Sequence, residues 1–301
     1  LLVLARIVTG LFGGVIGSIS MAIITDVFRM DQRGRVMGFV QMGFGASQVL
    51  GIPIGLYIGN AWGWQSAFLW IAIVALIIAM LIALKLQPIT AHLGLQRERS
   101  AGRHLWDTFS KKEYRIGFLA TALLSIGGFM MMPFSSVFAI NNLHVTHEQL
   151  PVLFMISGVS SLIIMPLIGR LSDQFDKFKI FTIATIWMIV MVLIYTSLGP
   201  TPFLIVVILN IMMMMGILSR MTPSSALVTA VPEMEDRGAF MSVSSSASIA
   251  GVVIVQKTNE SPLEHYTTLG YIVVLISLLT IYMIYKVSVI AKSKPIKEPR
   301  I

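Results

Sequence analysis

Cysteine is absent from this chain of 301 residues, and charged residues make up only 12% of it. The absence of cysteine excludes disulfide frameworks, cysteine-zinc sites, iron–sulfur clusters and thiol nucleophiles. Soluble domains usually carry about 25% charged residues, so this chain has too few to cover a surface that faces water. Intrinsic disorder is excluded as well, because it requires low hydrophobicity and high charge.

Hydrophobic residues are abundant instead, at 56% of the chain, and the mean hydropathy is +0.84. A helix needs about 20 mainly apolar residues to cross a bilayer. The stretches that meet this length predict nine membrane-spanning helices, at residues 1–28, 36–59, 66–86, 116–140, 151–169, 178–199, 202–222, 238–256 and 269–290. Serines dilute the eighth stretch, but serine can bond to its own helix backbone in lipid. The fold class predicted is an all-α integral membrane protein.

The basic residues are distributed unevenly among the loops that join these segments. If the loop at 29–35 is cytoplasmic and the loops alternate from there, every lysine and arginine except Lys257 and Arg6 falls on the cytoplasmic side. Such an excess is typical of cytoplasmic loops, so the net charge of +8 indicates topology and not a nucleic-acid partner. We expect a multi-pass protein of a cell membrane, of the bacterial inner-membrane type. Its cytoplasmic parts would be the loops at 29–35, 87–115, 170–179 and 221–237 and the C-terminus.

Two of these loops resemble each other. Residues 29–37 read RMDQRGRVM and residues 233–241 read EMEDRGAFM, at an offset of 204 without a gap. Repeats in the same orientation are a feature of transporters. The first two segments would then match the seventh and eighth, and the fourth to sixth would have partners before residue 1. We therefore expect a twelve-helix protein, in two bundles of six, whose first three helices precede this chain.

This arrangement predicts four parts. They are the remainder of the first bundle at 1–86, a basic cytoplasmic linker at 87–115, a six-helix bundle at 116–290 and a basic tail at 291–301.

Three stretches carry a resemblance to the major facilitator superfamily. Asp26 with the Arg33-Gly34-Arg35 run is similar to the end of the family's fourth helix and the loop after it. Residues 169–179 are similar to its Gly-x-Leu-x-Asp-Arg-x-Gly-Arg-Arg signature, with Gln174 in place of arginine and Asp176 in place of glycine. Leu2-x-x-x-Arg6-x-x-x-Gly10 resembles the membrane arginine motif of the drug:proton antiporter branch.

The resemblance implies a fold of two six-helix bundles, of which this chain would hold family helices four to twelve. It also implies a secondary active transporter that works by alternating access. The drug:proton antiporter and sugar-efflux branch suggests proton-coupled export of drugs, sugars or metabolites.

Arg6 is the one basic residue that we place inside the membrane, where a charge costs at least about 2.5–3.5 kcal/mol. We expect it to act in proton coupling or to contact a substrate anion; the alternative is that it reaches the outer interface. The 204 offset places Asn210 at the matching depth, either in the same pathway or in an interhelical hydrogen bond. Gln41 and Gln48 lie seven residues apart on one helix, and we expect both to line the pore.

Charged and glycine residues at the cytoplasmic ends form a second set of candidates. Asp26 would either carry a proton or pair with basic loop residues. The resemblance implies a third role for Asp26, in a charge link that latches the inner gate, and the same role for Asp173 at the other gate. The gate and loop motifs together contain Asp26, Arg33, Gly34, Gly169, Arg170, Asp173, Arg237 and Gly238.

Gly51, Gly55 and Gly59 lie on one helical face, with Pro53 between them. Small faces let helices approach closely, and proline kinks a helix. We expect this face to pack against another helix. It also resembles the antiporter signature of the family's fifth helix.

Other classes of function find little support. His144-x-x-His147-Glu148 lacks a third ligand, so no metal site is expected, and no loop of the nucleotide-binding type is present. We expect no cofactor and no enzymatic activity. The expected partners are a small-molecule substrate, protons and the lipid bilayer, and we expect a monomer. A proton-coupled importer of the same fold and a non-transporting receptor or scaffold remain alternatives.

Overall fold

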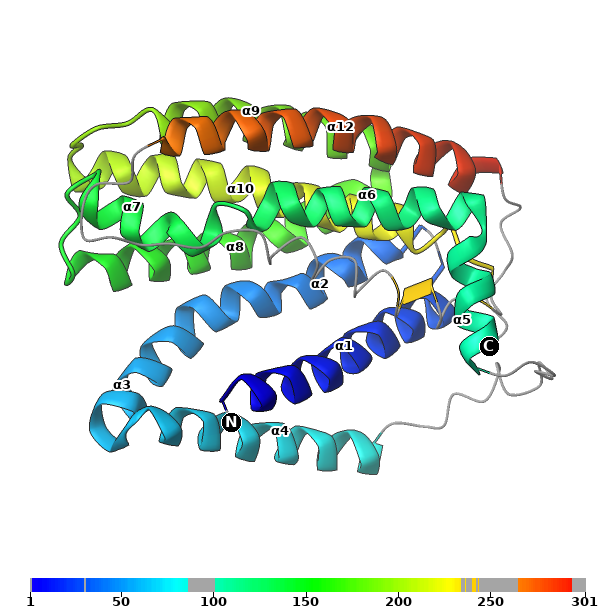
Figure 1. The fold of residues 1–301 in the computed structure, drawn as a ribbon, viewed down its shortest axis with the longest axis horizontal. Helices are drawn as coiled ribbons and strands as arrows, with labels where there is room; N and C mark the ends of the chain where they lie inside the picture. The colour runs from blue at the N-terminus through cyan, green and yellow to red at the C-terminus, as the bar shows by residue number, and fades with distance from the viewer. Residues whose placement is uncertain are drawn as a thin grey trace.

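The computed structural model describes residues 2–29, 31–85, 101–233, 236, 240–241, 243 and 265–293. Within these ranges the side chains of Arg6 and Asp26, among a few others, are not described. The described residues are helical, with no strand among them. Seven of their helical stretches are long and apolar enough to cross a membrane (Figure 1).

The first part of the chain forms a run of helices that doubles back once. Its elements are α1 (Leu2–Val27), α2 (Arg33–Ala46), a π-helical turn (Ser47–Gly51), α3 (Ile52–Trp62) and α4 (Trp64–Lys85). The π-turn and α3 continue α2, so these three elements make one candidate span from Arg33 to Gly59. The chain reverses at Gly63, whose φ of 87° lies in the left-handed region that glycine adopts without steric cost.

The second part holds the remaining elements: α5 (Ala101–Ser110), α6 (Lys112–Phe129), a 3-10 turn (Met132–Phe134), α7 (Ser135–Asn141), α8 (Gln149–Gln174), α9 (Lys177–Thr196), α10 (Phe203–Val228) and α12 (Tyr266–Ser293). Pro133 lies in the 3-10 turn, where the missing N–H breaks the helix between α6 and α7. Aromatic side chains join several elements beyond this break. Phe138 of α7 stacks on Tyr266 of α12 at 3.9 Å and contacts Tyr195 of α9.

The predicted spans agree with these helices except at two places. The seven candidate spans correspond to all predicted segments but the first and the eighth. The first corresponds to α1, whose described apolar stretch is Val15–Thr25. The eighth, at 238–256, lies almost wholly outside the described residues.

Several helices run further than the apolar stretches that predict them. α8 continues to Gln174 and α9 begins at Lys177, so the predicted loop at 170–179 shrinks to two residues. α2 already begins at Arg33, and part of the predicted linker at 87–115 is helical, in α5 and at the start of α6. α10 continues through Pro223 to Val228, so Arg220 lies inside this helix.

The two parts of the chain meet along α2. In Figure 1, α2 runs beside α8 and α10 where it begins, and α3 turns away from the second part. Burial follows this arrangement, because α10 holds fifteen buried residues whereas α4 holds none. The contact between α2 and α8 is therefore where the parts of the molecule are joined.

Candidate functional site

A line of small residues brings α2 and α8 into backbone contact. A Cβ built on Gly38 would lie 2.6 Å from the carbonyl oxygen of Met165, and one on Gly45 would lie 3.0 Å from that of Gly158. These distances are at or below the shortest that real side chains show, so any larger residue must push the helices apart. We call this contact the α2–α8 seam.

The seam extends over the whole length of α2. At its start, a Cβ on Gly169 would lie 2.7 Å from the carbonyl oxygen of Gly34. At its end, a Cβ on Gly158 would lie 2.9 Å from Cβ of Gln48. Successive positions along α2 contact progressively earlier positions along α8. The two helices therefore pack antiparallel. Small residues at helix contacts in membranes allow this close packing.

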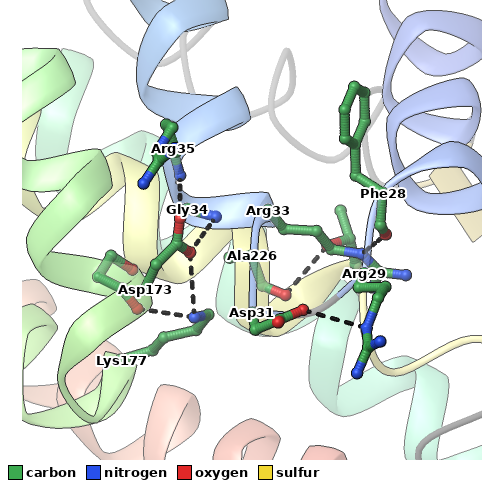
Figure 2. Close-up of polar contacts among 11 residues, drawn as sticks. Phe28, Arg29, Asp31, Arg33, Gly34, Arg35, Asp173, Lys177 and Ala226 are labelled. Atoms are coloured by element: carbon green, nitrogen blue, oxygen red, sulfur yellow. Dashed lines mark hydrogen bonds and ion pairs between the residues drawn. The ribbon is translucent and has the colours of Figure 1, made fainter.

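Asp173 closes the start of the seam. Its Oδ1 accepts a hydrogen bond from the backbone N–H of Gly34, and its Oδ2 accepts one from that of Arg35, each at 2.7 Å (Figure 2). Both N–H groups belong to the first turn of α2, which has no intrahelical partner for them. A carboxylate at a helix N-terminus is stabilised by the partial positive charge there, and charge-assisted hydrogen bonds are stronger than neutral ones. Asp173 thus caps a helix of the other part of the chain.

Lys177 supports this cap from the start of α9. Its Nζ lies 3.6 Å from Oδ1 of Asp173 and donates a hydrogen bond to the carbonyl oxygen of Ser172 at 2.7 Å. The side chains of Lys177 and Asp173 are 11% and 10% exposed, so the pair is largely shielded from water. Shielding from water and salt makes such a pair stronger than an exposed one.

Arg33 connects the end of α1 to the start of the seam. Its Nε donates to the carbonyl oxygen of Phe28 at 3.1 Å and its Nη2 to that of Thr25 at 2.7 Å. The side chain is buried, and Figure 2 draws Ala226 of α10 beside it. Arg33 therefore satisfies free carbonyl groups at the end of α1.

The predicted gate residues divide into three groups. Gly34, Gly169, Asp173 and Arg33 lie together at the start of the seam. Arg170 is exposed on the last turns of α8. Arg237, Gly238 and the side chain of Asp26 lie outside the described residues.

A cavity lies between α2 and the second part of the chain. Its lining residues are Gln41, Phe44, Gly128, Met131, Met132, Ser135, Met165, Met213, Met214, Ile217, Leu218, Met221 and Tyr266. Most of this surface is apolar, and six methionines contribute to it.

Gln41 and Gln48 do not share a surface, although their spacing predicts one. Gln41 lines the cavity, whereas Gln48 is buried against Gly158 in the seam. The physical reason is the π-turn that begins at Ser47, because its wider turn shifts the helical register after α2. A role for either glutamine in a substrate pathway stays a prediction.

Asn210 makes the interhelical hydrogen bonds that were one of its two predicted roles. Its Oδ1 accepts a bond from Oγ of Ser157 at 2.7 Å, and its Nδ2 donates to the hydroxyl oxygen of Tyr195 at 3.5 Å. These bonds link α10 to α8 and α9 in the core. Asn210 is not among the residues that line the cavity. Its predicted counterpart Arg6 belongs to α1, but the Arg6 side chain is not described.

The predicted glycine face on α3 has no close neighbour among the described residues. Nothing lies within 4 Å of a Cβ built on Gly55, and a Cβ on Gly59 would lie 3.9 Å from Cα of Trp64. The neighbour nearest to Gly51 is Ser47 of the same span, at 3.6 Å, and Pro53 is half-buried. The close packing predicted for this face is thus not made with any described part of the chain.

Arg220 is the buried residue that sequence reasoning missed. It is fully buried and lies within the candidate span Phe203–Val228. Its Nη2 donates to the carbonyl oxygen of Leu124 at 3.2 Å, and its Nη1 to Oγ of Ser277 at 3.4 Å. The predicted segment ends at residue 222, before Pro223, whereas the apolar run Ala226–Val228 is the signal that α10 continues.

A second polar cluster fixes the start of α6. The hydroxyl of Tyr114 donates to Oδ2 of Asp236 at 2.8 Å and accepts a bond from the N–H of Glu233 at 3.1 Å. Lys111 forms an ion pair with the same carboxylate. This cluster joins the end of the linker to the loop after α10.

Comparison with known proteins identifies the family. The sequence profile described as "Major Facilitator Superfamily" matches residues 1–255. The chain belongs to the Major Facilitator Superfamily. It is therefore a multi-pass membrane protein of a transporter family, which is not a class of enzymes.

Individual relatives in the superfamily are distant. A "Probable sugar efflux transporter" of Pasteurella multocida is 25% identical over 56% of this chain and 41% of its own length. An "Uncharacterized MFS-type transporter" of Bacillus subtilis is 24% identical over 92% of this chain and 72% of its own length. The chain thus matches less than half of the first relative's length and about three quarters of the second's.

A solved structure has the same fold. The crystal structure of a bacterial homologue of the iron transporter ferroportin, in an outward-facing state, is similar with a TM-score of 0.62 and 14% identity. The match covers 88% of this chain and 66% of that one. At this level of identity the likeness shows the fold alone.

Proposed function

We propose that the protein is a secondary active transporter that exports small molecules in exchange for protons by alternating access. The observation that carries this proposal is the α2–α8 seam. The two parts of the chain touch along α2, whereas α3 diverges from the second part, and a cavity lies between them (Figure 1). A molecule that is closed at one end and parted at the other is what one state of an alternating-access cycle requires.

The two hydrogen bonds by which Asp173 caps α2 are weak enough to be broken when a gate opens. Each charge-assisted hydrogen bond contributes about 1.5–3 kcal/mol to stability. The two bonds of Asp173 are of the same size as the few kcal/mol that separate the states of a protein with two populated conformations. Losing them would shift the population toward an opened seam without unfolding the helices.

Charge supports the assignment of the seam to the cytoplasmic side. Arg29, Arg35, Lys177 and Lys179 all lie near the start of α2 or the α8–α9 connection. Basic residues gather in cytoplasmic loops. In this orientation the closed seam is the inner gate of a protein of the bacterial inner membrane.

The cavity favours substrates with a large apolar part. Methionine side chains are flexible and polarizable, which suits binding surfaces that accept varied ligands. Gln41, Ser135 and Tyr266 add polar groups to the lining. We therefore propose drugs or metabolites of mixed polarity as substrates, and sugars as a second class because one relative carries a sugar-efflux name.

Transport in membrane vesicles tests this function. The full protein is assayed for uptake of a sugar and drug panel into inside-out vesicles, with an imposed pH gradient and with an uncoupler. We expect uptake that the uncoupler removes. An export function is contradicted if substrate moves only toward the cytoplasmic face, which would instead favour an importer. Binding without any flux would favour a receptor or scaffold.

Proton coupling is proposed to involve Arg6 in α1. Arg6→Ala should abolish flux driven by the pH gradient while the protein still reaches the membrane. Arg29→Ala is the matched control, because Arg29 is an exposed arginine outside any span and should leave flux unchanged. Unchanged flux in Arg6→Ala would remove Arg6 from the coupling pathway.

A further inference from the structure

Arg220 is a buried cation without a buried anion. Of the described residues, none offers a carboxylate within ion-pair distance of its guanidinium, and its only hydrogen-bond partners are the carbonyl of Leu124 and the hydroxyl of Ser277. Its Nε has no hydrogen-bond partner among the residues that the structure describes. Buried charges are normally paired, because an unpaired one carries a large desolvation cost. The guanidinium therefore keeps donors available for an anion.

The sequence around Arg220 supplies no counter-charge either. The predicted eighth span at 238–256 contains neither aspartate nor glutamate. The described acids of the second part lie toward the helix ends, at Asp173, Asp176 and Asp236, for example. An anion that pairs with Arg220 thus has to come from outside these helices.

Glycine leaves room for the guanidinium beside the cavity. A Cβ built on Gly128 would lie 3.2 Å from Nη2 of Arg220, and one on Gly127 would lie 3.4 Å from it. Gly128 also lines the cavity, as do Leu218 and Met221 on either side of Arg220 in α10. Gly128 is therefore adjacent both to the guanidinium, which does not itself line the cavity, and to the cavity.

We propose that Arg220 recognises the anionic group of a substrate whose apolar body occupies the methionine-lined cavity. This inference rests on the proposed transport function. The chemical class is a small amphipathic carboxylate, because the planar guanidinium fork matches a carboxylate in two-bonded geometry. The apolar lining accepts the rest of the molecule. A plain sugar would need no cation at this position.

Binding of a matched pair of probes tests the proposal without transport. The full protein is purified in detergent, and the melting temperature is followed with increasing 1-naphthoate or 1-naphthamide, which have the same ring and differ in charge. We expect the carboxylate to bind at least tenfold more tightly than the amide. Tenfold corresponds to about 1.4 kcal/mol.

Variants assign this selectivity to one side chain. Arg220→Gln should bind both probes equally, and Arg220→Lys should keep a reduced preference for the carboxylate because it keeps the charge but loses the fork. Ser219→Ala is the control, since Ser219 is a buried neighbour in the same helix and does not line the cavity. It should retain the full preference.

Three results would overturn the proposal. They are equal binding of the two probes by the unmodified protein, no binding of either probe, and an unchanged preference in Arg220→Gln. If Arg220→Gln does not fold, the unmodified protein and Arg220→Lys still decide the question. Charge-selective binding without flux would contradict the transport function alone, whereas flux with charge-blind binding would contradict only the role of Arg220.

Discussion

Two glycine faces follow each other along one membrane span, and only one of them is packed. Gly38 and Gly45 of α2 lie against the backbone of α8, whereas Gly55 of α3 has no described atom within 4 Å of its Cβ position. Residue type and spacing are similar in the two faces. The difference lies in the partner, because α8 runs beside α2 and α3 turns away from it (Figure 1). A small face therefore permits close packing but does not show that a partner is present.

The packed face also carries the charge that fixes it. Asp173 caps the first turn of α2 at the start of the seam. No carboxylate caps α3, which continues from the π-turn. Close packing and capping occur in the same region. A separate substitution in each shows how much each contributes to holding the seam together.

The largest effect is expected from a methyl group in the packed face. Gly45→Ala would force α2 away from Ser161 and Gly158 and should lower the free energy of unfolding by about 1–3 kcal/mol. The measurement is thermal unfolding of the purified protein. Gly43→Ala and Gly55→Ala are the controls, because nothing described lies within 4 Å of either Cβ position. Equal destabilisation by all three variants would erase the distinction between the faces.

A smaller effect is expected from removing the charge of the cap. Asp173→Asn keeps the shape, but its amide nitrogen cannot accept an N–H, so one of the two bonds is lost and the other becomes neutral, at a cost of about 1.4 kcal/mol in total. The seam should open about tenfold more often, which a cysteine at the buried Ser172 would report through faster reaction with a water-soluble maleimide. The chain has no other cysteine to react.

Asp176→Asn is the matched control for the cap. Asp176 accepts bonds from the N–H groups of Phe178 and Lys179 and from Nζ of Lys292, all within the second part. Burial opposes ionisation of this carboxyl, but these bonds hold its pKa below the usual value. Its loss should affect α9 and α12 and leave the labelling rate at Ser172 unchanged. The same increase in both variants would contradict a specific cap.

The smallest effect on stability is expected from a substitution at Asn210, which lies away from both glycine faces. Asn210→Ala removes interhelical hydrogen bonds, each of which contributes about 0.6 kcal/mol on average in membranes. Ser157→Ala should cost a similar amount, and the double variant little more, because both residues share one bond. Loss of flux with no loss of stability would instead place Asn210 in the substrate pathway.

Much of the fold follows from the sequence because length and hydropathy decide which segments cross a membrane. Seven candidate spans coincide with predicted segments. Helix ends were harder to predict, since helices continue past their apolar stretches into polar sequence, as α8 does up to Gln174. The position of Arg220 was missed for this reason.

The sequence predicted which residues of the candidate site belong together only where those residues are neighbours along the chain. Gly169 and Asp173 belong to one predicted motif on α8, whereas Gly34 belongs to a separate one. The motifs did not predict that Asp173 binds Gly34 across 139 residues of chain. The pairing of Gly45 with Gly158 depends on how α2 and α8 meet in space, which hydropathy does not contain. The separation of Gln41 from Gln48 depends on a single π-turn, and no residue type in the sequence predicts that turn.

Cross-linking tests the account's central claim, that the molecule is closed at the seam and parted at α3. Cysteines replace exposed residues in two pairs of the full protein, Arg35 with Arg170 and Tyr57 with Val152. The shortest bis-methanethiosulfonate linker should join the first pair and not the second. Substrate with a pH gradient should then lower the yield of the first pair and raise that of the second. Efficient linkage of both pairs at once, or yields that never change, would contradict the claim.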